Sequence, residues 1–176
     1  MSFLTPIAKY FGTIADRIIC VVFAVVFAQV PVYIAQYIDV LSGAQMESQK
    51  MYDDLVGRAQ KYELTIEEFL ERLKANPDVL VKENAEASES AVNRYKNYTD
   101  ALNALLHSSV WSKPFRLMKH YDPSIHSAMQ FEPNLPLTGE GLIYALLGVV
   151  VAVLLIGLIS SLFRVLFKRK KTEKAV

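Results

Sequence analysis

Two long stretches without a charged side chain constrain this sequence more than any other feature. They cover residues 18–38 and 141–163, which is 21 and 23 residues. As helices with a rise of ~1.5 Å per residue they would be about 31–35 Å long, enough for a hydrocarbon core of roughly 30 Å. Because an isolated strand would leave its backbone unsatisfied in lipid, the sequence predicts two transmembrane helices.

The first stretch has a second interpretation, as a cleavable signal peptide. A short lead ending at Arg17, an apolar run and a Val-Phe-Ala tripeptide at 26–28 follow one another as in a secretory signal. The apolar character continues beyond Ala28 to Ile38, however, and Asp16 weakens the basic lead. We therefore interpret the stretch as a span, and the mass of the mature N-terminus distinguishes the two.

Acidic residues predominate between the two stretches, and basic residues predominate outside them. Residues 39–140 contain 11 Lys and Arg against 16 Asp and Glu, whereas the two flanks together contain 8 basic and 2 acidic residues. Since cytoplasmic flanks of membrane helices are rich in Lys and Arg, both termini are expected in the cytoplasm. The basic residues that carry this topology are Arg17, Arg164, Lys168, Arg169, Lys170 and Lys171.

Composition excludes several classes of protein. The formal net charge of +1 argues against a nucleic-acid binder, and an apolar fraction of 52% excludes a disordered chain. The single cysteine, Cys20, excludes a disulfide framework and any multi-cysteine metal or redox motif.

The 102 residues from 39 to 140 have the periodicity of amphipathic helices. Thr65 begins a capping box, and at 76–78 Asn-Pro-Asp forms a break in which Asn76 is expected to cap the next helix and Pro77 to occupy its first position. The two helices should fold back on each other and bury two stripes. The first stripe is Leu41, Ala44, Tyr52, Leu55, Ala59, Tyr62, Ile66, Phe69 and Leu73, and the second is Leu80, Ala87, Ala91, Tyr95, Tyr98, Leu102 and Leu105.

The segment 110–121 mixes aromatic and other apolar residues with basic ones. This mixture is typical of a short helix at a membrane surface, although the same side chains could instead close the core of the helical hairpin. The residues expected at the membrane surface are Trp111, Lys113, Phe115, Arg116 and Lys119. Asp122 and Pro123 should then begin another short helix, and Thr138 is placed to cap the second span.

Each predicted span carries one face suited to contact with another helix. A glutamine amide in hydrocarbon needs a partner, and small residues allow helices to approach closely. The residues expected in such contacts are Gln29, Tyr33, Gln36, Gly141, Ala145, Gly148 and Ala152. The two faces would pack together within one subunit or in a homo-oligomer; a pore or a docking surface for another membrane protein is the alternative.

Residues capable of chemistry are few. His120, Asp122 and His126 lie close in sequence, but Pro123 interrupts their helix face and their spacing matches no tetrahedral zinc pattern. No nucleophile elbow, phosphate-binding glycine loop or zinc-protease motif is present. We therefore predict no catalytic residue, metal site or cofactor.

Three stretches of the chain resemble a known family. They are QVPVYIAQY at 29–37, the Asn-Pro-Asp break at 76–78, and FEPNLPLTGEGL at 131–142. In these stretches the chain is similar to domain of unknown function 2937, a family of small inner-membrane proteins of Gram-negative bacteria. The resemblance implies two spans and a helical periplasmic domain, and it implies no catalytic or binding residues.

The sequence therefore predicts an all-α membrane protein with five segments: a cytoplasmic N-terminus (1–17), two transmembrane helices (18–38 and 141–163), a periplasmic helical domain (39–140) and a basic cytoplasmic tail (164–176). The leading hypothesis is a non-enzymatic inner-membrane scaffold or accessory subunit that assembles with itself or with another membrane protein. The alternatives are a ligand-sensing module with a separate signalling subunit, a transporter or channel subunit, and a membrane enzyme using the region 120–126.

Overall fold

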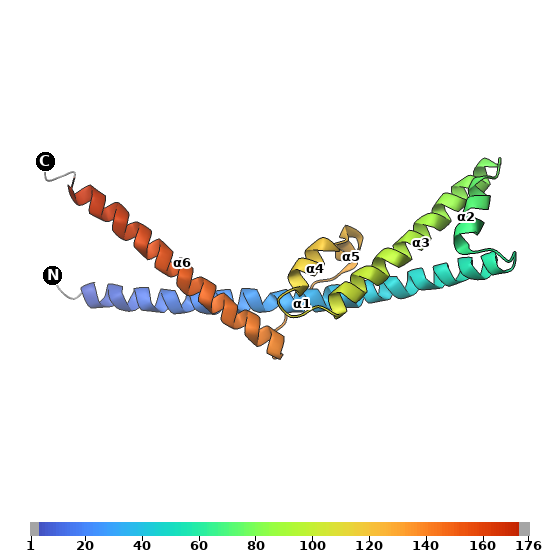
Figure 1. Ribbon diagram of the computed structural model, residues 1–176. Coiled ribbons are helices and arrows are strands. Elements are labelled where there is room, and N and C mark those ends of the chain that lie inside the picture. The colour runs from blue at the N-terminus through green and yellow to red at the C-terminus, as the bar shows by residue number, and fades with distance from the viewer. Residues whose placement is uncertain (1–3, 173–176) are drawn as a thin grey trace. The chain divides into compact units, whose positions relative to one another are not determined.

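The computed structural model describes residues 4–172, with side chains described for 14–162, and all regular structure in that range is helical (Figure 1). The helices are α1 (Leu4–Gln60), α2 (Ile66–Lys74), α3 (Val79–Leu106), α4 (Lys113–Lys119), α5 (Pro123–Ala128) and α6 (Gly139–Thr172). This confirms the all-α class. Two of these helices, α1 and α6, are long and apolar enough to cross a membrane, and only 17% of the most apolar window of each is buried. Exposed apolar side chains are expected of a helix surrounded by lipid, whereas the core helix of a soluble protein has its apolar side chains buried.

The chain divides into two compact units, which are described separately. The apolar unit consists of residues 1–33 and 132–176, and the middle unit consists of residues 34–131. Helix α1 belongs to both, because it continues without a break through Pro31 to Gln60.

In the apolar unit, α6 packs against α1 through small residues. A Cβ atom on Gly148 would lie 2.5 Å from the carbonyl oxygen of Phe23, and Ala152, one turn further along α6, is fully buried. Tyr144 is buried on the same face of α6. Only a residue without a side chain lets the two backbones approach this closely.

The connection into α6 has the expected N-terminal cap. The Thr138 hydroxyl accepts a hydrogen bond from the Gly141 amide at 3.1 Å, which satisfies one of the free donors of the first turn. Gly141 also lies against Pro136, whose carbonyl oxygen a Cβ at this position would meet. The prediction for Thr138 is therefore confirmed.

In the middle unit, the last turns of α1 run beside α3. The rings of Tyr52 and Tyr95 stack with centroids 4.6 Å apart, and the Gln45 side chain donates to the Thr99 hydroxyl at 3.3 Å. Helix α2 closes the end of this pair, as Figure 1 shows. The core there combines side chains of all three helices, namely Leu55, Ile66, Leu70 and Val92.

The turn between α1 and α2 follows from two local features. Glu63 has a φ of 56°, which lets the chain reverse, and Thr65 and Glu68 form the predicted capping box. The Glu68 amide donates to the Thr65 hydroxyl at 3.2 Å, while the Glu68 carboxylate accepts from the Thr65 amide at 2.9 Å. The pKa of Glu68 is lowered mainly by the hydrogen bond from the Thr65 backbone amide.

The start of α3 differs from the prediction by two residues. Asp78, not Asn76, is the N-cap: its carboxylate accepts from the Leu80 amide at 2.9 Å. The Asn76 side chain instead accepts from the Asp78 amide at 2.9 Å, forming a local turn that places Pro77 before the helix rather than in it.

Parts of the two predicted stripes are exposed. Tyr62 lies in the turn after α1, and Leu80 and Ala87 lie on the exposed side of α3; none is buried. Leu105 of the predicted stripe is buried, and the other buried residues of α3, Ala85, Val92 and Ala101, lie outside that stripe.

Candidate functional site

Tyr37, near the start of the middle unit, contacts the turn at residues 120–122. Its side chain is fully buried, and its hydroxyl accepts a hydrogen bond from the Asp122 amide at 2.9 Å. The same hydroxyl donates to the carbonyl oxygen of His120 at a long 3.5 Å, and the ring stacks on Tyr121 with centroids 6.1 Å apart. One side chain of α1 therefore holds the turn between α4 and α5.

Asp122 fixes the start of α5. Its carboxylate accepts from the Ser124 amide at 2.8 Å and from the Ser124 hydroxyl at 2.6 Å, as expected from the Asp-Pro pair that begins this helix. The Ser124 hydroxyl is also 3.4 Å from the hydroxyl of Tyr98 on α3. These hydrogen bonds, above all the one from the Ser124 side chain, lower the pKa of Asp122. The carboxylate therefore stays charged at neutral pH.

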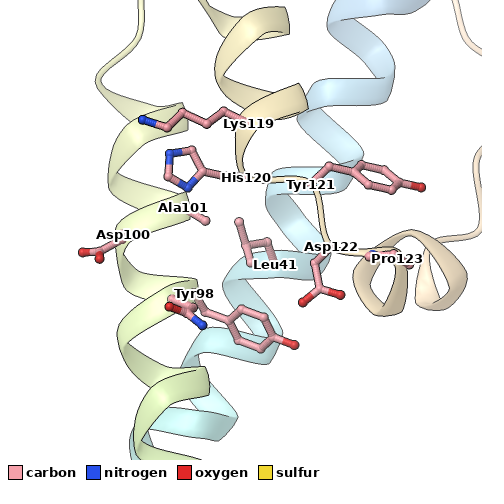
Figure 2. Close-up of a pocket in the computed structure, with 10 residues that line it drawn as sticks. Leu41, Tyr98, Asp100, Ala101, Lys119, His120, Tyr121, Asp122 and Pro123 are labelled. Atoms are coloured by element: carbon pink, nitrogen blue, oxygen red, sulfur yellow. The ribbon is translucent and has the colours of Figure 1, made fainter.

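A pocket of about 460 Å³ lies beside this turn (Figure 2). Leu41 of α1 lies between the α3 side chains and the turn that follows α4. The lining consists of Leu41, Asn97, Tyr98, Asp100, Ala101, Lys119, His120, Tyr121, Asp122 and Pro123. An apolar floor with amide, hydroxyl, basic and acidic groups around it suits a small polar molecule.

The residues singled out for chemistry are only partly brought together. His120 and Asp122 both line this pocket, whereas His126 lies outside it, with its ring 5.8 Å from that of Tyr121. The carboxylate of Asp100 points away from Asp122 (Figure 2). Among the residues that the structure describes, no three His, Cys, Asp or Glu side chains are grouped as metal ligands would be.

The residues predicted for helix contacts lie in both units. Gln29 of the apolar unit donates from Nε2 to the carbonyl oxygen of Asn134 at 3.1 Å, and its Oε1 atom is buried without a hydrogen-bond partner. Tyr33 is half-buried in the same unit, and Gln36 is half-buried in the middle unit. On α6, Gly141, Gly148 and Ala152 are buried and Ala145 is half-buried.

The aromatic and basic segment is largely exposed. Trp111 is 59% exposed, Phe115 73% and Met118 77%, whereas Leu117 is the buried side chain of α4. Trp111, Phe115 and Met118 therefore do not close the core of the hairpin, which was the alternative interpretation of this segment. Arg116 and Lys119 are exposed as well, and Lys113 is half-buried.

The residues predicted to set the topology are described only in part. Arg17 is exposed on α1. Arg164, Lys168, Arg169, Lys170 and Lys171 belong to α6, but their side chains lie outside the described residues.

Sequence reasoning missed Tyr37 as the residue that holds the turn between α4 and α5. In the sequence, Tyr37 is one more aromatic residue at the end of an apolar stretch. Its two hydrogen-bond partners are more than 80 residues away in the chain, so no local pattern indicates them. Tyr144 was missed for a similar reason: it lies one position from Ala145, and only the structure shows that Tyr144 is buried whereas Ala145 is half-buried.

Together the two apolar helices and the helical middle unit define a membrane-protein class with two candidate spans. Within that class the chain belongs to the family described as Protein of unknown function (DUF2937), whose model matches residues 11–169 and so nearly the whole sequence. No curated protein and no solved structure matches the chain.

Proposed function

We propose that this chain is a bacterial inner-membrane scaffold or accessory subunit. Both termini lie in the cytoplasm, and the middle unit stands in the periplasm, where it binds a protein partner or another copy of itself. Two apolar helices, a basic tail and an acidic region between the helices support this arrangement.

The observation that carries the binding role is an open hollow at the end of the middle unit where α1 turns into α2. Its volume is about 420 Å³, and its lining combines apolar and aromatic side chains with three basic ones. The lining residues are Arg58, Lys61, Tyr62, Leu64, Phe69, Arg72 and Leu73. Tyr62 is 68% exposed and stacks on Phe69 with centroids 6.3 Å apart.

This chemistry fits a protein segment that carries an apolar side chain next to acidic residues. Aromatic rings and arginine are enriched where protein surfaces bind one another. Arg58 is already paired with Asp54 at 2.7 Å, so Lys61 and Arg72 are the side chains expected to meet the acidic residues of the partner.

Photocrosslinking in intact membranes tests the binding role. A photoreactive residue at Tyr62 should give a defined adduct, whereas the same residue at the exposed Asn93 of α3 should not. The substitutions Lys61→Glu and Arg72→Glu should weaken the Tyr62 adduct, because they reverse the charge around the hollow. Detergent-solubilised protein that is strictly monomeric, without any adduct from Tyr62, would contradict the proposal.

Cysteine labelling tests the topology. In a Cys20→Ser background, a cysteine replacing the exposed Ser90 should react with a membrane-impermeant maleimide in cells with a permeabilised outer membrane. A cysteine replacing Thr172 should react only after lysis. Labelling in the opposite pattern, or cleavage of the first apolar stretch, would refute the arrangement.

The pocket beside Tyr37 supports a second function, the sensing of a small polar molecule. Asn97 is exposed at its rim, so Asn97→Trp should fill the pocket without disturbing the core. A compound that raises the melting temperature of the wild-type protein but not of Asn97→Trp would establish this function. Equal shifts in both proteins, or none across a metabolite collection, would exclude it.

A further inference from the structure

We infer that α4 lies in the headgroup region of the bilayer and binds anionic lipids, in the leaflet where the first span ends. Trp111, Phe115 and Met118 enter the interface, and the basic side chains of the segment contact the lipid phosphates. This inference rests on the part of the proposed function that places the first apolar stretch across the membrane, but it is independent of any protein partner.

The first observation is that three large apolar side chains of this segment are exposed. Phe115 and Met118 are three residues apart, so they share one face of α4, and they are 73% and 77% exposed. Trp111 precedes the helix by one turn and is 59% exposed. Leu117 alone is buried on α4 and anchors the helix to the rest of the middle unit.

The second observation places the C-terminal end of α4 beside the end of the first apolar stretch. The turn at its C-terminal end is hydrogen-bonded to Tyr37, through the Asp122 amide at 2.9 Å and the His120 carbonyl at 3.5 Å. Tyr37 is the last residue but one of the uncharged stretch 18–38, and Asp39 follows that stretch. Since an uncharged stretch of this length spans the hydrocarbon, its end marks the headgroup region, and the C-terminal end of α4 is held beside it.

The third observation is local charge. Residues 101–121 contain Lys113, Arg116 and Lys119 and no Asp or Glu, although the region between the spans is acidic as a whole. Arg116 and Lys119 are exposed on the same short helix as Phe115 and Met118. A basic, aromatic surface fits anionic phosphate headgroups, each basic side chain near such a surface strengthening binding roughly fivefold. An acidic protein segment could also pair with these basic side chains, but it would not explain why Tyr37 holds the end of α4 beside the end of the apolar stretch.

Trp111 is the sole tryptophan of the chain, so its fluorescence reports on this segment alone. The full-length protein is placed in nanodiscs of phosphatidylcholine, with or without phosphatidylglycerol, whose scaffold protein lacks tryptophan. We expect blue-shifted emission, quenching by lipids that carry a nitroxide near the headgroup, and protection from acrylamide. Protection should be greater with phosphatidylglycerol. Emission typical of water and full acrylamide quenching in both lipids would overturn the inference.

Matched variants separate the contributions of the apolar and basic side chains. Phe115→Ser with Met118→Ser should raise the acrylamide quenching of Trp111 several-fold, whereas Val79→Ser with Leu80→Ser, equally exposed but on α3, should leave it unchanged. Lys113→Gln, Arg116→Gln and Lys119→Gln together should abolish the effect of phosphatidylglycerol. The matched control, Lys50→Gln, Lys82→Gln and Arg94→Gln, removes three exposed basic side chains elsewhere in the middle unit and should retain it.

Two further outcomes are decisive. Protection of Trp111 that increases with the number of protein molecules per nanodisc, independently of lipid charge, would assign the surface to a second copy and overturn the inference. Cysteine labelling that fails to place Ser90→Cys outside the cytoplasm would refute the topology instead, whatever the lipid dependence of Trp111. The two failures are therefore distinguishable.

Discussion

Replacing Tyr37 by phenylalanine tests how the base of the middle unit is held. The substitution keeps the ring that stacks on Tyr121 but removes the hydroxyl that accepts from the Asp122 amide at 2.9 Å. The bond to the His120 carbonyl, at 3.5 Å, is long and contributes little. Leaving a partly buried amide without its acceptor costs about 1–3 kcal/mol. We expect the turn at 120–122 to open more often by a corresponding factor, roughly tenfold for each 1.4 kcal/mol.

Hydrogen exchange measured by mass spectrometry in detergent or nanodiscs reads this opening directly. Peptides covering residues 119–125 should exchange roughly 5- to 150-fold faster in Tyr37→Phe, while peptides from α2 should be unchanged. Tyr62→Phe is the matched control, because that side chain is 68% exposed and its ring contact with Phe69 is preserved. Unchanged exchange at 119–125 in Tyr37→Phe would show that the hydroxyl does not hold the turn.

Three other substitutions test features of both units. Gly148→Ala should destabilise the contact between α6 and α1 by about 1–3 kcal/mol, since its Cβ would meet the Phe23 carbonyl oxygen, whereas Gly157→Ala, with open space around it, should not lower the melting temperature in detergent. Thr65→Ala should cost about 1 kcal/mol by removing the N-cap of α2, measured by denaturant unfolding; an unchanged midpoint would contradict the role of the capping box. Because the pKa of Asp122 is lowered in the folded protein, its stabilising contribution is fully present above the ordinary value of 3.8 and is lost as the pH falls through the lowered value. Asp122→Asn, which retains a capping side chain, should therefore lose less stability than the wild type on acidification, and equal losses would refute this.

Local signals in the sequence predicted most of the elements correctly. The uncharged stretches predict the two long apolar helices, and Thr65, Asp122 and Thr138 mark three helix starts that the structure confirms. Each of these signals acts within a few residues, which is why sequence alone reveals it. The predicted N-cap of α3, Asn76, was wrong. Both Asn76 and Asp78 are suitable N-cap residues, and only the backbone geometry selects Asp78.

The candidate sites were less predictable, because they depend on contacts between distant parts of the chain. The pocket beside Tyr37 joins α1, α3 and the turn after α4, and none of these segments carries a distinctive motif. The sequence places Tyr62 in a buried stripe, because its spacing continues the helical pattern of the preceding residues. The spacing does not show that α1 ends at Gln60, just before Tyr62, which leaves this ring exposed in the hollow. The exposure of Phe115 and Met118 likewise depends on which side of α4 carries Leu117 into the core.

The hydrogen bond between Tyr37 and Asp122 closes an excursion of 85 residues on a single hydroxyl group. Both ends of this excursion meet at its base, so its length is free to change without moving the ends. The segment formed by α2 and the neighbouring turns of α1 and α3 is thus a natural place for insertions, deletions or exchange, because the contacts of Tyr37 with the turn after α4 do not depend on it.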